Sequence, residues 1–106
     1  MKPFTEPGTD QISLPGVMGA LADPVRIEIV RRLAADGETV CGTLDLGVAK
    51  ATRSHHLRVL REAGLTRTRA SGTRRHVSLR RDDLDARFPG LLDAVLAAPP
   101  VSTAAL

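Results

Sequence analysis

The sequence predicts a mainly α fold that carries a single β-hairpin. Two segments, residues 23–37 and 49–64, place apolar side chains at helical spacing and end in glycine. A third segment, residues 65–80, is rich in threonine and arginine around Gly72 and alternates apolar with polar residues in its second arm, which is typical of two strands and a turn. A chain of 106 residues has room for one compact domain of this kind.

The first part of the chain is expected to be a loose arm followed by two helices. Residues 1–14 mix proline, glycine, threonine and aspartate without periodicity, and we expect them to form a flexible N-terminal arm. Residues 15–22 can make two helical turns. The next helix begins with Asp23 as a good N-cap and Pro24 at the first helical position, and it ends at Gly37.

The middle of the chain contains a weak segment, a strong helix and the hairpin. Residues 38–47 carry only a weak signal for a short helix or a turn. The following helix, residues 49–63, is stopped by Gly64. The pattern up to this point indicates a helix-turn-helix pair, and the basic hairpin at residues 65–80 follows it directly.

The last helical stretch is expected to be interrupted. Within residues 82–98, an apolar stripe too rich for a lone surface helix is formed by Leu91, Leu92, Val95 and Leu96. Phe88 precedes Pro89, which disfavours helical backbone at Phe88. We therefore expect a break and a restart within this stretch. Residues 15–98 form the predicted domain, and residues 99–106 are expected to be a disordered tail.

Positive charge is concentrated in one part of the chain. Between Lys50 and Arg81 there are ten lysines and arginines against one acidic residue, Glu62, which gives this segment a net charge of +9 while the rest of the chain carries −6. A basic segment on a compact domain is the electrostatic footprint of a polyanionic partner such as DNA. A solvated charged face is the alternative explanation.

The remaining composition excludes several classes of protein. Phe4 and Phe88 are the only aromatic residues apart from histidine, which argues against proteins that stack single-stranded bases on aromatic rings. The N-terminal residues lack the apolar run of a signal peptide, and no segment is apolar enough to span a membrane. Since the chain has one cysteine, Cys41, it cannot form an intramolecular disulfide, so we expect a cytoplasmic protein.

Three motifs together resemble a known family. The segments LADPVRIEIVRRL (21–33) and RSHHLRVLREAGL (53–65), followed by an arginine-rich hairpin with Gly72 at its tip, are similar to the ArsR/SmtB family of bacterial winged-helix transcriptional regulators over about residues 17–97. The resemblance implies a winged helix-turn-helix fold and a homodimer formed through the first and last helices, the latter at residues 82–98. It also implies a repressor that reads a palindromic DNA operator with helix 49–63 and wing 65–80, and that a signal releases.

Helical geometry selects candidate DNA contacts on helix 49–63. When Leu57 is placed at the centre of the buried face, Leu60 falls beside it and the polar side chains fall on the far side. A recognition helix reads base edges with its N-terminal residues, while arginines on a wing contact phosphates or the minor groove. We expect two of the four wing arginines to matter. The predicted DNA-contacting residues are Lys50, Thr52, Arg53, Ser54, His55 and Arg58 on the helix and Arg67, Arg69, Arg74 and Arg75 on the wing.

Arg53 departs from the helix-turn-helix pattern, which usually has an apolar residue at this position. Two explanations are open: its stem packs while its guanidinium reaches toward DNA, or the helix is slightly rotated.

The histidines do not predict a metal site. His55 and His56 are adjacent, so on a helix they point about 100° apart, whereas a metal-binding pair on one helix is spaced i, i+4. We expect His55 to face outward and His56 to be packed. The ligand patterns of metal-sensing family members are absent, and four aspartates without nitrogen or sulfur ligands do not suit zinc. We therefore expect no metal and no cofactor.

Other functions remain as alternatives. Cys41 lies alone near the turn, so a redox-responsive repressor is one of them, although a buried, inert thiol is commoner. A non-specific architectural DNA-binding protein is another, because arginine alone gives affinity without specificity. A protein-interaction module has no need of the basic segment. An enzyme is not expected, because the sequence contains no phosphate-binding loop, nucleophile elbow or carboxylate pair. The sequence does not identify an inducer.

Overall fold

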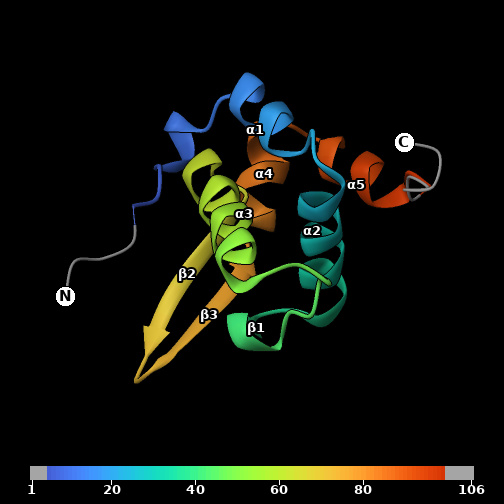
Figure 1. The fold of residues 1–106 in the computed structure, drawn as a ribbon. Coiled ribbons are helices and arrows are strands. Elements are labelled where there is room, and N and C mark those ends of the chain that lie inside the picture. Colours follow the sequence, from blue (N-terminus) through green and yellow to red (C-terminus); the bar gives the residue numbers. More distant parts are fainter. Residues whose placement is uncertain (1–4, 100–106) are drawn as a thin grey trace.

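A computed structural model describes residues 5–99 and shows five α-helices, two short 3-10 helices and one three-stranded antiparallel sheet among them. Three helices form one side of the molecule, the hairpin projects away from them, and the last two helices return to the helical side (Figure 1). In chain order the elements are η1 (Thr9–Gln11), α1 (Leu14–Ala20), α2 (Pro24–Asp36), β1 (Thr39–Val40), η2 (Cys41–Thr43), α3 (Lys50–Ala63), β2 (Thr66–Ser71), β3 (Arg74–Leu79), α4 (Arg81–Arg87) and α5 (Leu91–Ala97).

The helix ends lie where the sequence predicts them. The carboxylate of Asp23 accepts hydrogen bonds from the first backbone N–H groups of α2, and Gly37 ends that helix with φ +77°. The last helical stretch is broken as expected, because α4 ends at Phe88 and α5 restarts after Gly90. The predicted tail, apart from Pro99, lies outside the described residues.

The sheet contains one strand that the sequence analysis missed. Strands β2 and β3 pair from Thr66 opposite Leu79 to Ser71 opposite Arg74, so the turn between them has two residues. Gly72 opens this turn with φ +61°, a conformation that glycine adopts without strain. Residues 38–47 do not simply form a helix or turn, because β1 pairs with β3 and gives the order β1-β3-β2. A strand of two residues is too short to show alternation in the sequence.

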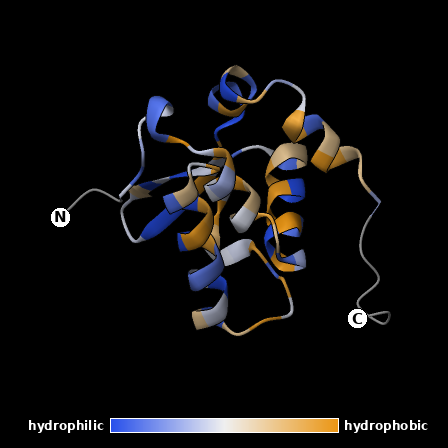
Figure 2. Ribbon diagram, turned by 90° about the horizontal axis from the view of Figure 1, so that it is seen from above, coloured by the Kyte–Doolittle hydropathy of each residue, from blue (hydrophilic) through white to orange (hydrophobic). Residues whose placement is uncertain are grey.

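The core lies between α2, α3 and the inner face of the sheet. Ile29 and Val30 of α2, Leu60 of α3 and Val77 of β3 each have at most 1% of their surface exposed. Each of these helices carries both hydrophobic and hydrophilic residues (Figure 2), which is the pattern of helices that cover a shared core. The predicted apolar stripe of α2 is therefore buried as expected, although Val25 is only partly covered.

The prediction of a loose N-terminal arm is wrong for residues 5–14, which are anchored to the rest of the domain. Ile12 is buried, with 1% of its surface exposed, and its backbone carbonyl accepts a hydrogen bond from Arg87 of α4. A Cβ atom added to Gly64 would lie 2.6 Å from Cγ1 of Ile12, so the missing side chain at this helix end makes room for the isoleucine. The burial of one large apolar side chain anchors the segment that the composition suggested was free. Residues 1–4 of the predicted arm lie outside the described residues.

Candidate nucleic-acid interface

Helix α3 presents its polar N-terminal half to solvent. Its buried residues are His56, Leu57 and Leu60, so the helix has the rotation predicted from its sequence. The exposed face carries five of the six residues that were expected to contact DNA from this helix: Lys50, Thr52, Ser54, His55 and Arg58.

A basic groove separates α3 from the hairpin. Its volume is about 600 Å³; one wall comes from α3 and the other from β2, the turn and β3, and Val40–Gly42 also line it. The residues that line it include five basic side chains and no acidic one; the basic ones are Lys50, Arg53, Arg61, Arg74 and Arg75. A concave surface with charge of a single sign attracts a polyanion more strongly than the same charges dispersed.

Arg53 lines this groove and also supports the turn before α3. Its side chain is partly buried, and Nη1 donates a hydrogen bond of 3.3 Å to the backbone carbonyl of Leu44. Leu44 is itself in the core. The arginine at this normally apolar position therefore packs its stem and satisfies a carbonyl of the turn, while the helix keeps its expected rotation.

The four wing arginines fall into two pairs. Arg67 forms ion pairs with Glu6 (Nε–Oε2, 3.4 Å) and with Asp83 (Nη2–Oδ2, 3.6 Å) at the base of the hairpin. Arg69 pairs with Glu38 at 2.8 Å, and this hydrogen bond lowers the pKa of the Glu38 carboxyl below its ordinary value. The other two, Arg74 and Arg75, follow the turn at the start of β3 and line the basic groove. Arg74 and Arg75 thus lie across the groove from α3, whereas the two arginines of β2, Arg67 and Arg69, are ion-paired with carboxylates.

The histidines lie as the helical phase predicts. His56 has 8% of its surface exposed and its Nδ1 lies 3.2 Å from Nη1 of Arg26 on α2, whereas its neighbour His55 is exposed. His76 of β3 lies near Glu38, with Nδ1 3.7 Å from Oε1. Within residues 5–99, no group of three or more histidine, cysteine, aspartate or glutamate side chains is arranged to hold a metal ion.

Cys41 lines the basic groove and is half-buried. Burial raises the pKa of its thiol above the ordinary value, while the positive charges of Arg53 and Arg75 act in the opposite direction. Because the thiolate is the reactive form, a raised pKa reduces the reactivity of this cysteine at neutral pH.

One basic residue of the +9 segment is part of the protein interior, which the charge count did not reveal. The side chain of Arg80 is 3% exposed; its Nε donates to Asp83 and its Nη1 donates to the carbonyl of Pro7. The i, i+3 spacing of Arg80 and Asp83 was the available signal for the first of these contacts.

Comparison with known proteins identifies the family. A family model described as a helix-turn-helix domain matches residues 21–69, which span α2, the turn, α3 and the start of the hairpin. An uncharacterized HTH-type transcriptional regulator of Bacillus subtilis, YceK, is 39% identical over 82 residues, which cover 74% of this chain and 82% of the relative. The chain belongs to the helix-turn-helix transcriptional regulators. A second HTH-type regulator, from Methanocaldococcus jannaschii, is 39% identical to it over 59 residues, which cover 54% of this chain and 66% of that one.

Solved structures of other regulators share the fold of this helix-turn-helix regulator. An ArsR family transcriptional regulator superimposes with a TM-score of 0.62 at 24% identity, over 85% of this chain and 92% of that one. A possible transcriptional regulatory protein from Mycobacterium bovis gives 0.63 at 29% identity, over 80% and 91%. The winged helix-turn-helix fold is confirmed, and it is the fold of a structure described as an ArsR family regulator. Within residues 5–99 the regulator has no helix with the length and apolar character needed to cross a bilayer.

Proposed function

We propose that this regulator is a sequence-specific repressor that binds a palindromic DNA operator as a homodimer. The observation that carries the proposal is the basic groove, which lies beside the exposed polar face of α3 and contains no acidic side chain. In the proposed complex α3 enters the major groove, and the hairpin meets the adjacent backbone or minor groove. The relatives named above are transcriptional regulators, so we propose no enzymatic activity, and we place the protein in the cytoplasm with its DNA.

The exposed residues of α3 have the chemistry that base recognition requires. Lys50, Ser54 and His55 carry hydrogen-bonding groups suited to base edges in the major groove, and Thr52 also has a methyl group for contact with thymine. Arg58 lies two turns into the helix, nearer the phosphates. Arg74 and Arg75 would complete the contact from the wing.

An apolar surface on the opposite side supports the homodimer. A groove of about 630 Å³ runs between α1, α2 and α5 and is lined mainly by apolar side chains, among them Leu21, Val25 and Val95. Met18 and Leu14 of α1 are 53% and 46% exposed and lie one helical turn apart, so they add to the apolar surface of α1. A second copy covering this face through α1 and α5 would bury them, and the resulting two-fold axis requires a two-fold operator.

An architectural DNA-binding protein is the second candidate. The same basic groove would bind phosphates of any sequence, and the affinity would then depend steeply on salt without sequence preference. A repressor and an architectural protein therefore differ in the ratio of specific to non-specific affinity.

The experiment is a titration of the full chain into a labelled duplex of about 30 bp from its own upstream region, with a scrambled duplex of equal composition as control, at two salt concentrations. A specificity ratio above about 10³, with one dimer bound per duplex, is the result expected of the repressor. Equal and steeply salt-dependent binding to both duplexes supports the architectural protein. Absence of binding at low salt contradicts both.

A further inference from the structure

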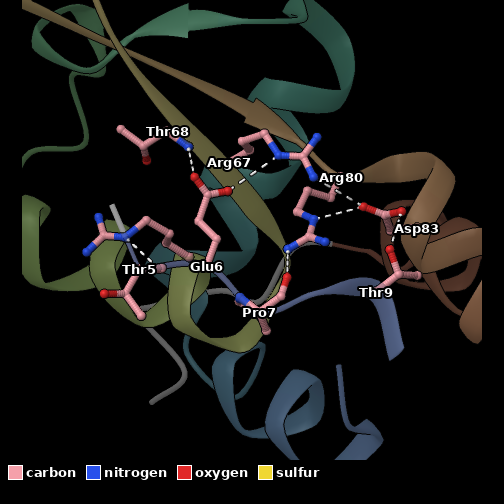
Figure 3. Close-up of polar contacts among 9 residues, drawn as sticks. Thr5, Glu6, Pro7, Thr9, Arg67, Thr68, Arg80 and Asp83 are labelled. Atoms are coloured by element: carbon pink, nitrogen blue, oxygen red, sulfur yellow. Dashed lines mark hydrogen bonds and ion pairs between the residues drawn. The ribbon is translucent and has the colours of Figure 1, made fainter. Parts of the chain in front are cut away.

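The segment before η1 contacts both walls of the basic groove. Nε of Arg61, on α3, donates a hydrogen bond of 3.3 Å to the backbone carbonyl of Thr5. The backbone N–H of Thr68, on β2, donates to Oε1 of Glu6 at 3.4 Å, and Oε2 of the same carboxylate is the atom paired with Arg67 (Figure 3). Arg61 and Thr68 line the groove from opposite walls. Residues 5–9, called here the N-terminal clamp, therefore join the recognition helix to the wing.

The clamp is anchored from the other side by α4. Pro7 presents its carbonyl to the buried Arg80, and Thr9 donates its hydroxyl proton to Oδ1 of Asp83 at 2.9 Å (Figure 3). Asp83 in turn holds Arg80 through Oδ2 at 2.9 Å. Because both anchoring contacts are to partly buried or charged groups, the backbone between them has little freedom to move away from the hairpin.

Glu6 occupies the free edge of the sheet. In the order β1-β3-β2, strand β2 has no strand on its outer side among the described residues, so the N–H of Thr68 faces outward. The Glu6 carboxylate satisfies this N–H and one guanidinium of the same strand, although its own side chain is only 19% exposed. The negative charge of this largely buried carboxylate repels DNA phosphates, so Glu6 does not contribute to DNA affinity by its charge. Its contacts indicate a structural role instead.

We propose that Glu6 is a positioning residue that sets the distance between α3 and the wing, and thereby the specificity of DNA binding. This inference rests on the proposed function. Glu6 itself does not touch DNA; it acts through Thr68 and Arg67 on one wall, while the adjacent carbonyl of Thr5 holds Arg61 on the other.

The test compares Glu6→Ala with Asp10→Ala in the full chain. Both variants remove one negative charge from the same N-terminal segment, but the exposed Asp10 carboxylate makes none of the clamp contacts described above. Removal of the charge alone would raise the affinity for every DNA duplex. Such a uniform gain leaves the ratio of operator to scrambled-duplex affinity unchanged, whereas a positioning role predicts that Glu6→Ala lowers this ratio, by about tenfold where the free energy of one charged hydrogen bond is lost from operator binding alone. Asp10→Ala is expected to keep the wild-type ratio.

Hydrogen exchange of the Thr68 amide, measured without DNA, tests the clamp separately from the proposed function. We expect exchange about tenfold faster in Glu6→Ala than in the wild type. Glu6→Gln keeps the shape of the side chain and an acceptor oxygen, so its Thr68 exchange rate is expected to lie between those of the wild type and Glu6→Ala. This variant replaces Glu6→Ala in the test if the alanine variant does not fold. Unchanged Thr68 exchange, or an equal gain in affinity for both duplexes, would overturn the proposal. If the wild type itself does not distinguish the duplexes, the proposed function fails and the exchange result alone decides on the clamp.

Discussion

Nη1 of Arg26 lies 3.2 Å from Nδ1 of His56, and this contact joins α2 to α3 at the edge of the core. A guanidinium has only donors, so Nδ1 of His56 is the acceptor in this contact. Nε of the same arginine donates to the carbonyl of Ala20 at the end of α1. A single side chain therefore ties the first three α-helices together.

Replacement of His56 by alanine is expected to destabilise the domain by about 2 kcal/mol, because a hydrogen bond to a charged group is lost and a small cavity remains. His55→Ala, at the exposed neighbouring position, is expected to change the free energy of unfolding by less than about 0.5 kcal/mol. Urea unfolding of both variants at neutral pH is the measurement. An equal loss in the two would contradict the role assigned to Arg26.

Gly64→Ala is expected to cost about 3 kcal/mol. Two terms contribute: φ is +90° at this residue, and a Cβ would lie 2.6 Å from the side chain of Ile12. Gly72→Ala shares only the first term, since φ is +61° and no heavy atom lies within 4 Å of the added carbon, so about 1 kcal/mol is expected. In an Ile12→Ala background the cost of Gly64→Ala should fall toward the Gly72 value. Thermal unfolding of the wild type, the three single variants and the double variant checks this, and an undiminished cost would refute the steric explanation.

Asp83 gives the stability a dependence on acid. The hydrogen bond from Arg80, then that from Thr9, lowers the pKa of the Asp83 carboxyl below the ordinary 3.8. The native state thus binds the proton less readily than the unfolded chain. The stabilisation is fully present above the ordinary value and is lost as the pH falls through the lowered pKa. Denaturant unfolding between neutral and acidic pH should show a shallower decline for Asp83→Asn than for the wild type, whereas Asp82→Asn, which is exposed, should keep the wild-type slope.

The two pairs of wing arginines should differ in their contribution to DNA binding. Arg74→Ala removes one charge from the basic groove of each protomer, two in the proposed homodimer, and we expect the slope of log affinity against log salt to become shallower by about 1.8. Arg69→Ala removes the same charge but also frees Glu38 from its ion pair, and a smaller change is expected. Operator titrations at several salt concentrations provide both slopes. Identical slopes for the two variants would show that the ion pair does not withhold Arg69 from DNA.

Cys41 is expected to respond slowly to peroxide because burial raises the pKa of its thiol. Operator affinity should therefore fall equally, or not at all, in wild type and Cys41→Ser after brief exposure to peroxide. A loss confined to the wild type would instead support the redox-responsive alternative. Mass measurement of the treated proteins gives the control, since it reports whether the thiol was oxidised.

The elements whose ends are marked by particular residues could be predicted from the sequence alone. Asp23 begins α2, Gly37 and Gly64 end α2 and α3, and Gly72 turns the hairpin, each through a backbone conformation or hydrogen bond that only a few residue types provide. The exposed face of α3 followed from the same local rules, since helical phase depends only on nearby residues.

The features that depend on distant partners could not be predicted in this way. Strand β1 exists because Thr39 and Val40 pair with β3, nearly forty residues later, and the N-terminal segment is held by β2 and α4. The count of charges along the sequence overestimated the number of arginines available to DNA for the same reason. It treated every arginine of the basic segment as available to DNA, whereas Glu6 and Glu38 lie outside the segment and neutralise Arg67 and Arg69.

Strand β1 also ties the hairpin to the far end of α2. Only Gly37 and Glu38 separate α2 from β1, and β1 is hydrogen-bonded to β3. With 13 residues, α2 is about 20 Å long, so a tilt of about 5° around its N-terminal end would move its other end by about 2 Å. The beginning of α2 borders the apolar groove and its end carries the wing. A tilt of α2 beside the apolar groove would therefore displace β1 and, through its pairing, the part of β3 at His76 and Val77.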